Sequence, residues 1–346
     1  MAYTTITDPS AYFQTALYTG NGSSTNAITN DGNSDLKPDW LWLKSRSIVS
    51  DNIIFDSTRG TNKRLSGNTT GAEATQSYYS SFDTDGFTIG NSNANVNQNG
   101  ATYVNWQWKA NGGTTASNSN GTITSTVQAN TTAGFSIISY TGNGTNGATI
   151  GHGLSQTPQI FFPKCLSTTT NWEMYYFPTG GTKQYGYLNL TNAFGTWSYT
   201  APTSTTIGLS GSGDSNGNGR TMIGYAFHSV QGYSKIGTYT GNGNANGTFV
   251  YTGFKPAFVI FKSTTGSKDW YMLDRLRTAS GNPINKILHP NKSDAESTSA
   301  VFDFLSNGFK FRNGDNAWNG DGDSYLYMAF AQNPLVATND VIALAR

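Results

Sequence analysis

Two tryptophans stand near acidic residues in a pattern that suits contact with a sugar. Asp269 and Asp274 bracket Trp270, and Trp172 occupies the corresponding place earlier in the chain. An aromatic ring can pack on the apolar face of a sugar while carboxylates accept hydrogen bonds from its hydroxyls. The same pattern is typical of an ordinary strand edge. These four residues are therefore candidate glycan-binding residues with a structural alternative.

A second candidate site is the loop that runs from Asp214 through Asn216 and Asn218. Its spacing matches the first half of a calcium-binding loop, in which oxygen ligands occupy alternating positions. The twelfth position of such a loop carries a glutamate, and here it is Tyr225. Turn formation also explains a loop rich in Asn and Gly. Asp214, Asn216 and Asn218 are thus calcium candidates, and no other cofactor is predicted.

Residues that could support catalysis are sparse and scattered. The histidines lack a nucleophile-elbow pattern, and the glutamates lie in separate segments, whereas a glycanase needs two carboxylates that flank a cleft. A single cysteine can form neither an intrachain disulfide nor a cysteine-based zinc site. These residues are His152, His228, His289, Glu73, Glu173, Glu296 and Cys165. We predict that the chain is not an enzyme.

Composition narrows the class of protein further. Charged residues make up only 12% of the 346 residues and aromatic residues 13%, which indicates folded β-structure with polar loops rather than disorder. The net charge is +1 and the basic residues form no run, so nucleic acid is not an expected partner. The start of the chain does not resemble a secretory signal, and no long apolar run occurs. We expect synthesis in a cytoplasm and no membrane insertion.

A repeat organises the chain. The string Tyr-Thr-Gly-Asn-Gly begins at Tyr18, Tyr140 and Tyr239. In each copy a proline follows, then an apolar run, then a lysine six positions after the proline. These pairs are Pro38 and Lys44, Pro158 and Lys164, and Pro256 and Lys262. Each copy closes on an aromatic strand, namely 103–108, 222–227 and 325–330. The period is too long for a solenoid, so each copy should be a domain-sized unit.

The short β-branched and aromatic runs, separated by Gly, Asn, Ser and Thr, predict an all-β fold of three tandem, divergent β-sandwich modules. We name them module 1 (1–112), module 2 (113–230) and module 3 (231–346). A flexible or extended linker rich in Gly, Ser, Thr and Asn is expected at 110–133. The repeated Asn-Gly should close a hairpin after the strand that ends in Tyr-Thr.

Two features of the repeat invite a structural interpretation. We expect the stem of the recurring lysine to cover apolar surface while its ammonium group reaches solvent. A tryptophan recurs eight residues beyond the lysine in modules 2 and 3, but module 1 has Asn52 at that place. Module 1 is therefore expected to lack the role that this tryptophan plays elsewhere.

Several motifs in order resemble a repeat module of virion proteins from marine bacteriophages, including cyanophages. The resemblance rests on 8–22, on Lys37 to Arg46, on Asp56 to Gly60, on the close at Tyr103 to Ala110 and on the ending Tyr327 to Pro334. It covers nearly the whole chain outside the linker. It implies tail-fibre-like or other structural components with lectin-like or jelly-roll β-sandwich modules and no catalytic residues.

From the resemblance and the residues we expect a virion structural protein of the tail-fibre type. It would bind a host surface glycan or protein, contact other virion proteins, and form a homo-oligomer, with a trimer as the expected arrangement. Module 1 would dock on the particle. Two alternatives remain: a capsid decoration or cement protein, and, less favoured, a tail-spike glycanase.

Overall fold

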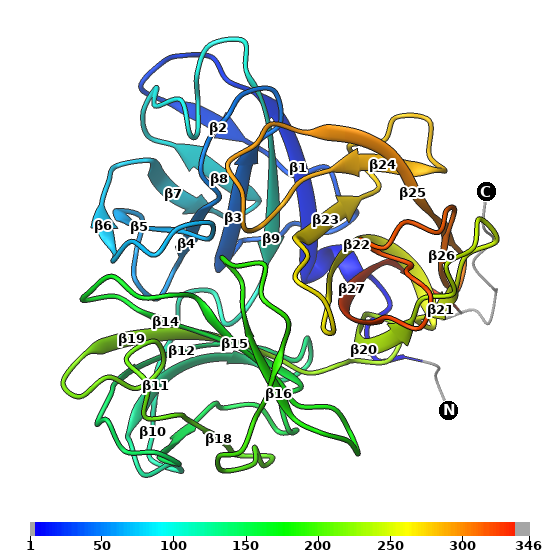
Figure 1. Ribbon diagram of the computed structural model, residues 1–346. Coiled ribbons are helices and arrows are strands. Elements are labelled where there is room, and N and C mark those ends of the chain that lie inside the picture. The colour runs from blue at the N-terminus through cyan, green and yellow to red at the C-terminus, as the bar shows by residue number, and fades with distance from the viewer. Residues whose placement is uncertain (1–3, 336–346) are drawn as a thin grey trace.

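The structure, a computed structural model, describes residues 4–335, and its regular secondary structure consists almost entirely of antiparallel strands (Figure 1). The all-β prediction is confirmed. A short 3-10 helix, η1 (Pro9–Ala11), precedes the first strand. No helix among the described residues has the length and apolar character needed to cross a bilayer.

The strands of each module are listed here in chain order. Module 1 contains β1 (Phe13–Thr19), β2 (Asn26–Ile28), β3 (Trp40–Ser45), β4 (Ile53–Asp56), β5 (Lys63–Ser66), β6 (Ala74–Thr75), β7 (Tyr79–Asp83), β8 (Gly86–Ile89) and β9 (Thr102–Trp108). Module 2 contains β10 (Ala116–Asn118), β11 (Ser125–Asn130), β12 (Phe135–Thr141), β13 (Thr149–Gly151), β14 (Ile160–Cys165), β15 (Glu173–Tyr176), β16 (Gln184–Tyr187), β17 (Gly195–Thr196), β18 (Thr206–Gly208) and β19 (Thr221–Phe227). Module 3 contains β20 (Ser234–Thr240), β21 (Phe249–Tyr251), β22 (Phe254–Ser263), β23 (Trp270–Asp274), β24 (Ile284–Ile287), β25 (Ser297–Leu305), β26 (Gly308–Phe311) and β27 (Ser324–Pro334).

The main sheets of the modules repeat one strand order. It is β1-β9-β3-β4 in module 1, β12-β19-β14-β15 in module 2 and β20-β27-β22-β23 in module 3. A second sheet covers one face of each main sheet and also keeps its order, as β2-β8-β7, β13-β18 and β21-β26-β25-β24. Among the described residues no sheet combines strands of two modules. The boundaries of the modules as domains stay a prediction.

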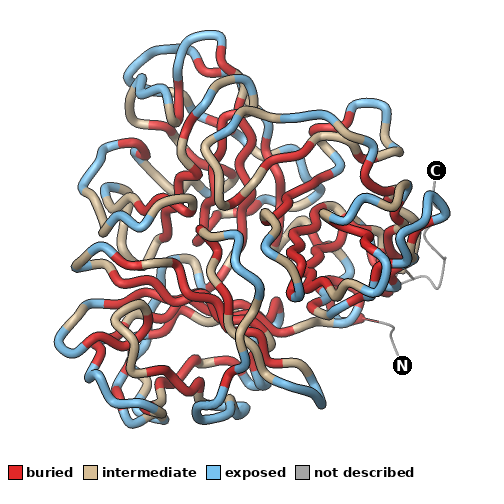
Figure 2. Tube along the Cα trace, in the orientation of Figure 1, coloured by how far each residue is buried: buried red, intermediate tan, exposed pale blue. Residues whose placement is uncertain are grey.

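Both faces of each main sheet are buried. On β3, Leu41 and Leu43 face the second sheet of module 1, while Trp40 and Trp42 face the opposite way because side chains alternate along a strand. The outer face of each main sheet, by which we mean the face turned away from its second sheet, packs against those of the other two modules in one shared core. The apolar runs before the recurring lysines are therefore continuous rather than alternating, and Figure 2 shows the buried residues gathered in the middle of the molecule.

Three aromatic rings at equivalent places in the closing strands meet at the centre of the shared core. Trp108 lies 6.5 Å from Phe227 and 5.5 Å from Phe330 between ring centroids, and the last two are 5.9 Å apart. Each module contributes one ring. The three sheets thus surround a common centre in an approximately threefold arrangement, as the three lobes of Figure 1 show.

The structure corrects two expectations. Residues 110–133 do not form a flexible linker, because β10 and β11 lie there and β11 extends the main sheet of module 2 by pairing with β12. β10, at the sheet edge, is polar, and β11 has Val127 as its one residue in the buried core cluster, so the segment carries little apolar signal in the sequence. The repeated Asn-Gly does not close a hairpin either, since the strands on its two sides, β1 and β2 in module 1, belong to different sheets.

The shared core predicts that the modules unfold together. Phe330→Ala should lower the free energy of unfolding by about 3–5 kcal/mol, the usual effect of removing a buried aromatic ring. Urea unfolding followed by tryptophan fluorescence and by far-ultraviolet circular dichroism should give one coincident transition at a lower midpoint. Phe249→Ala, a change at a ring that is 43% exposed, is the control and should change little. Separate transitions, with only one displaced, would show that the modules are independent.

Candidate functional site

The recurring lysine of each module is buried, and its ammonium group does not reach solvent. Lys44, Lys164 and Lys262 all have 0% exposure. Lys164 Nζ donates to the carbonyl oxygen of Thr170 at 2.7 Å, in its own module, and to that of Thr70 at 3.1 Å, in module 1. The expectation of a solvent-exposed ammonium is wrong, because the lysine is buried and a loop of the neighbouring module supplies one of its acceptors.

The other two lysines repeat this bond and close a cycle. Lys262 Nζ donates to Thr191 O of module 2 at 3.0 Å, and Lys44 Nζ donates to Ser293 O of module 3 at 3.2 Å. The lysine of module 2 therefore bonds to module 1, the lysine of module 3 to module 2, and the lysine of module 1 to module 3. We call the three segments that are held the latch loops; they are residues 66–73, 187–194 and 289–296.

A second bond to each latch loop explains the recurring tryptophan. The indole N–H of Trp172 donates to Ser66 O at 2.8 Å, and that of Trp270 donates to Tyr187 O at 2.8 Å. In both cases the acceptor is the first residue of the latch loop. The ring also packs in the shared core, so one side chain provides both apolar contact and a directed bond.

Module 1 keeps this role without a tryptophan. Asn52 Nδ2 donates to the carbonyl oxygens of His289 and Lys292, both at 2.9 Å, and His289 is the first residue of the third latch loop. The indole of Trp42, on the adjacent strand, donates to Asn52 Oδ1 at 3.0 Å. The expectation that module 1 lacks the role is wrong, because the amide makes the bond and Trp42 supplies aromatic bulk beside it.

Backbone bonds complete each latch. The last residue of each loop donates its N–H to the carbonyl of the residue two positions after a recurring lysine. The pairs are Glu73 to Leu166 at 2.9 Å, Phe194 to Thr264 at 2.9 Å and Glu296 to Arg46 at 2.8 Å. The latch loops are thus equivalent at their first, fifth and eighth positions. Sequence inspection missed them because their side chains differ and most of the acceptors are backbone carbonyls.

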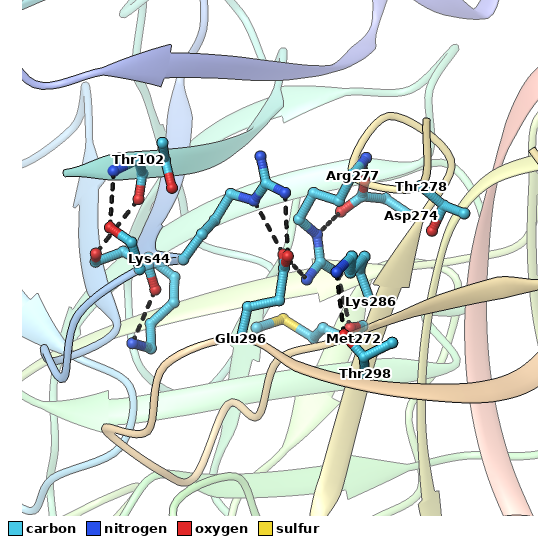
Figure 3. A network of polar contacts seen from close by, with 12 residues as sticks. Lys44, Thr102, Met272, Asp274, Arg277, Thr278, Lys286, Glu296 and Thr298 are labelled. Carbon is cyan, nitrogen blue, oxygen red and sulfur yellow. Dashed lines mark hydrogen bonds and ion pairs between the residues drawn. The ribbon is translucent and has the colours of Figure 1, made fainter. Parts of the chain in front are cut away.

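Buried ion pairs reinforce two of the three junctions. Arg277 Nε donates to Asp274 Oδ2 at 2.5 Å, and Glu296 lies 3.2 Å from Arg277 Nη1 and 2.9 Å from Nε of Arg46 in module 1 (Figure 3). The indole of Trp106, also in module 1, donates to Asp274 at 3.0 Å. A buried charge is tolerated when it is paired and hydrogen-bonded, and here the pairing crosses between modules.

The junction between modules 1 and 2 repeats this arrangement. Arg59 Nε donates to Asp56 Oδ2 at 2.5 Å and Nη1 to Glu73 at 3.2 Å, while the hydroxyl of Tyr225 in module 2 donates to Asp56 at 2.7 Å. The signal in the sequence is an Asp followed three residues later by an Arg, which occurs at Asp56 and again at Asp274.

The predicted glycan residues lie inside these contacts. Trp172 is 0% exposed and Trp270 is 1% exposed, so neither ring has a face to offer a sugar. Asp274 is 0% exposed and bonded to Arg277. Asp269 is partly exposed and is paired with Lys292 at 2.6 Å. The structure therefore corrects the assignment of Trp172, Trp270 and Asp274 to a sugar site, because these side chains are buried. The assignment of Asp269 stays a prediction.

The predicted calcium residues belong to a loop lock that occurs in all three modules. Asn216 is 0% exposed; its Oδ1 accepts from the Asn143 N–H at 2.9 Å and its Nδ2 donates to Thr145 O at 2.9 Å. Asp214 accepts from the Asn171 N–H at 2.9 Å, and no hydrogen bond involves the Asn218 side chain among the described residues. Calcium binding stays a prediction, with Asn216 committed to the loop.

The same lock explains why Tyr-Thr-Gly-Asn-Gly recurs. Asn97 and Asn319 make the bonds of Asn216 in modules 1 and 3. The repeated tyrosine donates to the carbonyl just before this asparagine, for instance Tyr18 to Val96 at 2.6 Å. The first Gly is required because a Cβ at Gly20 would lie 2.1 Å from Gln98 O. The sequence does contain a signal for this lock. Each of the three asparagines stands six positions before the same point of the closing strand, as Asn97 does before Tyr103.

Some titratable groups lie together in pairs, such as Glu173, which accepts a hydrogen bond from the Tyr175 hydroxyl at 2.8 Å. Burial lowers the pKa of His152 to about 4 and also lowers the pKa of His228 and His289. The described residues contain no cluster of three or more His, Cys, Asp or Glu side chains that could hold a metal ion. Cys165 is buried on β14.

Comparison with known proteins gives a family but no activity. Residues 8–334 match the model of a family described as a domain of unknown function (DUF7483). No curated protein and no solved structure matches the chain.

The buried lysines predict how stability depends on pH. Burial lowers the pKa of Lys44, Lys164 and Lys262 to about 8, from the usual 10.5. Between these values the unfolded chain binds more protons than the folded chain, so stability rises with pH there. Buried tyrosines, whose pKa is raised by burial, oppose this only near their usual pKa of 10. Urea unfolding should give a larger free energy at about pH 9.5 than at about pH 7.5.

Lys164→Met should reduce that gain, and the exposed Lys235→Met is its matched control. A free energy of unfolding that falls between the two pH values, or a gain that Lys164→Met leaves unchanged, would show that the lysines are not buried as charged groups.

Asn52 offers a test of the latch in module 1. Asn52→Ala removes an acceptor for the Trp42 indole and a donor for two carbonyls, so the free energy of unfolding should fall by about 1–3 kcal/mol. Asn99→Ala, at an exposed asparagine, should have almost no effect. Equal urea midpoints for the two variants would mean that the Asn52 bonds add nothing to stability.

Proposed function

We propose that this chain, which belongs to the DUF7483 family, is a non-enzymatic structural protein of a bacteriophage particle. Its class is tail fibre or host attachment. It is made in the bacterial cytoplasm and acts in the virion, where it contacts other virion proteins and binds a host surface glycan or protein. The proposal rests on the resemblance of its motifs to phage virion modules and on how the repeated residues are used.

One observation carries the proposal: side chains that recur at fixed spacing hold the modules together. The recurring lysines and the Trp172, Trp270 and Asn52 positions all bond to latch loops. The recurring Tyr-Thr-Gly-Asn-Gly strings lock loops within a module. A sequence whose repeated residues build a scaffold supports a structural role.

The outer loops are where binding is expected. They are the exposed parts of the molecule in Figure 2, and loops on a rigid scaffold commonly carry recognition. Modules fixed in one body also present several loops at once, and linked weak sites bind far more tightly than single ones. A homotrimer would multiply them again and remains part of the proposal.

Binding without turnover is favoured by the state of the carboxylates. Asp56, Glu73, Asp274 and Glu296 are held in ion pairs at module junctions. A glycanase would need two carboxylates free to face a substrate, one as acid and one as base or nucleophile. Ion-paired carboxylates in a core are suited to holding a scaffold.

Localisation on the particle tests the proposal. Antibody against module 3 should label intact particles of a phage that encodes the chain, and cryo-electron microscopy should place the density on the tail. Density on the capsid lattice would overturn the tail placement and establish the decoration alternative. Particles without any label would overturn the virion assignment altogether.

A further inference from the structure

Three adjoining cavities form a trough where the chain passes from one module to the next. The first, of about 510 Å³, is lined by Tyr12, Lys109 and Thr131 among others. The second, of about 560 Å³, shares Thr131 with the first. The third, of about 370 Å³, shares Ser229 and Gln231 with the second and ends at Tyr251. We call this row of three adjoining cavities the junction trough.

The lining of the junction trough is rich in uncommitted hydrogen-bonding groups. The side chains of Thr131, Thr132, Gln156 and Gln231 are exposed and form no hydrogen bond with another described residue. Hydroxyl and amide groups both donate and accept, which suits a ligand covered with hydroxyls. These side chains differ from those of the latches, which are saturated with partners.

Charge in the trough has one sign. Lys109 lines the first cavity and Lys235 the third, and the three linings contain no Asp or Glu. Neither lysine forms an ion pair with a described residue. In a chain with almost as many acidic as basic residues, a long trough without a carboxylate favours a ligand that carries negative charge.

His228 adds an unpaired polar atom. It lines the second cavity, is 3% exposed, and its Nε2 has no hydrogen-bond partner among the described residues. Its Nδ1 lies 3.0 Å from Ser229 O and therefore carries the proton in the neutral ring, which leaves Nε2 as an acceptor. An unpaired buried acceptor is unfavourable until a donor reaches it.

An exposed aromatic ring lines the third cavity, and a second lies near it on the same strand. Tyr251, in the third cavity, is 54% exposed, and Phe249, two residues earlier on the same edge strand β21, is 43% exposed. Residues two apart on a strand lie on the same face. Flat apolar faces beside a polar trough suit the apolar face of a sugar ring.

We propose that the junction trough binds an extended acidic glycan, with its hydroxyls on the Thr and Gln side chains, its acidic groups near Lys109 and Lys235, and one sugar ring on Tyr251. This inference rests on the proposed attachment function and names its ligand class and its site. It replaces the sugar site that the sequence suggested around Trp172 and Trp270.

Binding to a defined probe tests the trough. The full chain is titrated with a sulfated galactan hexasaccharide and with the desulfated form of the same oligosaccharide, alongside an array of acidic and neutral bacterial polysaccharides. Acidic glycans should bind, and desulfation should weaken binding at least about tenfold. Tyr251→Ala and the double variant Gln156→Ala with Gln231→Ala should each weaken it about tenfold, with unchanged urea midpoints.

Tyr199→Ala is the matched control, because Tyr199 is 40% exposed and lies outside the trough. No binding to any acidic glycan, or equal binding by the Tyr251 and Tyr199 variants, overturns the trough as a glycan site. If antibody still labels the particle in that case, the attachment proposal stands without this ligand. If the particle is unlabelled, the attachment proposal itself has failed.

Discussion

A buried ammonium group that must find its acceptors in a neighbouring module is the constraint on which the structure depends. A lysine taken out of water is strongly unfavourable unless its protons are hydrogen-bonded. Lys44, Lys164 and Lys262 reach only part of their acceptors within their own module, and the remainder come from a latch loop. Each module therefore completes another, and because the order is cyclic, no module stands at a free end.

The shared core follows from the same arrangement. Once latch loops bring the outer faces of the main sheets together, those faces can be apolar, and Trp108, Phe227 and Phe330 meet at the centre. Several of the few charged residues in this chain are buried at the module junctions. The charges that remain inside are paired mostly within a module, and contacts across the junctions, from Arg46 to Glu296, Tyr225 to Asp56 and Trp106 to Asp274, suit one mutual orientation of the modules.

The sequence predicted the all-β fold and the repeat well, because strands, turns and spacing are local signals. It failed where the partner of a residue lies in another module. Lys164 on an apolar run resembles a side chain that extends to solvent, and nothing local reveals that Thr70 will cover it. Asn52 resembled a lost tryptophan because its acceptor carbonyls lie far along the chain. Residues 110–133 resembled a linker because the edge strand β10 is polar and β11 beside it contributes only Val127 to the buried core cluster.

Recurring and non-recurring residues have different roles in this chain. Residues that recur are committed to latches, locks and core, and they have little freedom to contact a partner. The places where the repeat breaks are free to differ. Lys109, His228 and Ala331 occupy equivalent positions, since each donates its N–H to the carbonyl of the residue just before β1, β12 or β20, which are equivalent strands of the main sheets. They nevertheless differ completely in side chain, and the first two line the junction trough.

The central claim is that the modules form one body closed by three latches. Hydrogen exchange followed by mass spectrometry, on the native chain and on Trp172→Ala, tests it most directly. The variant removes one bond and one ring at the junction of modules 1 and 2. We expect faster exchange in the main sheets of all three modules, including β22 and β27 of module 3. Faster exchange confined to modules 1 and 2, with module 3 unchanged, would contradict it.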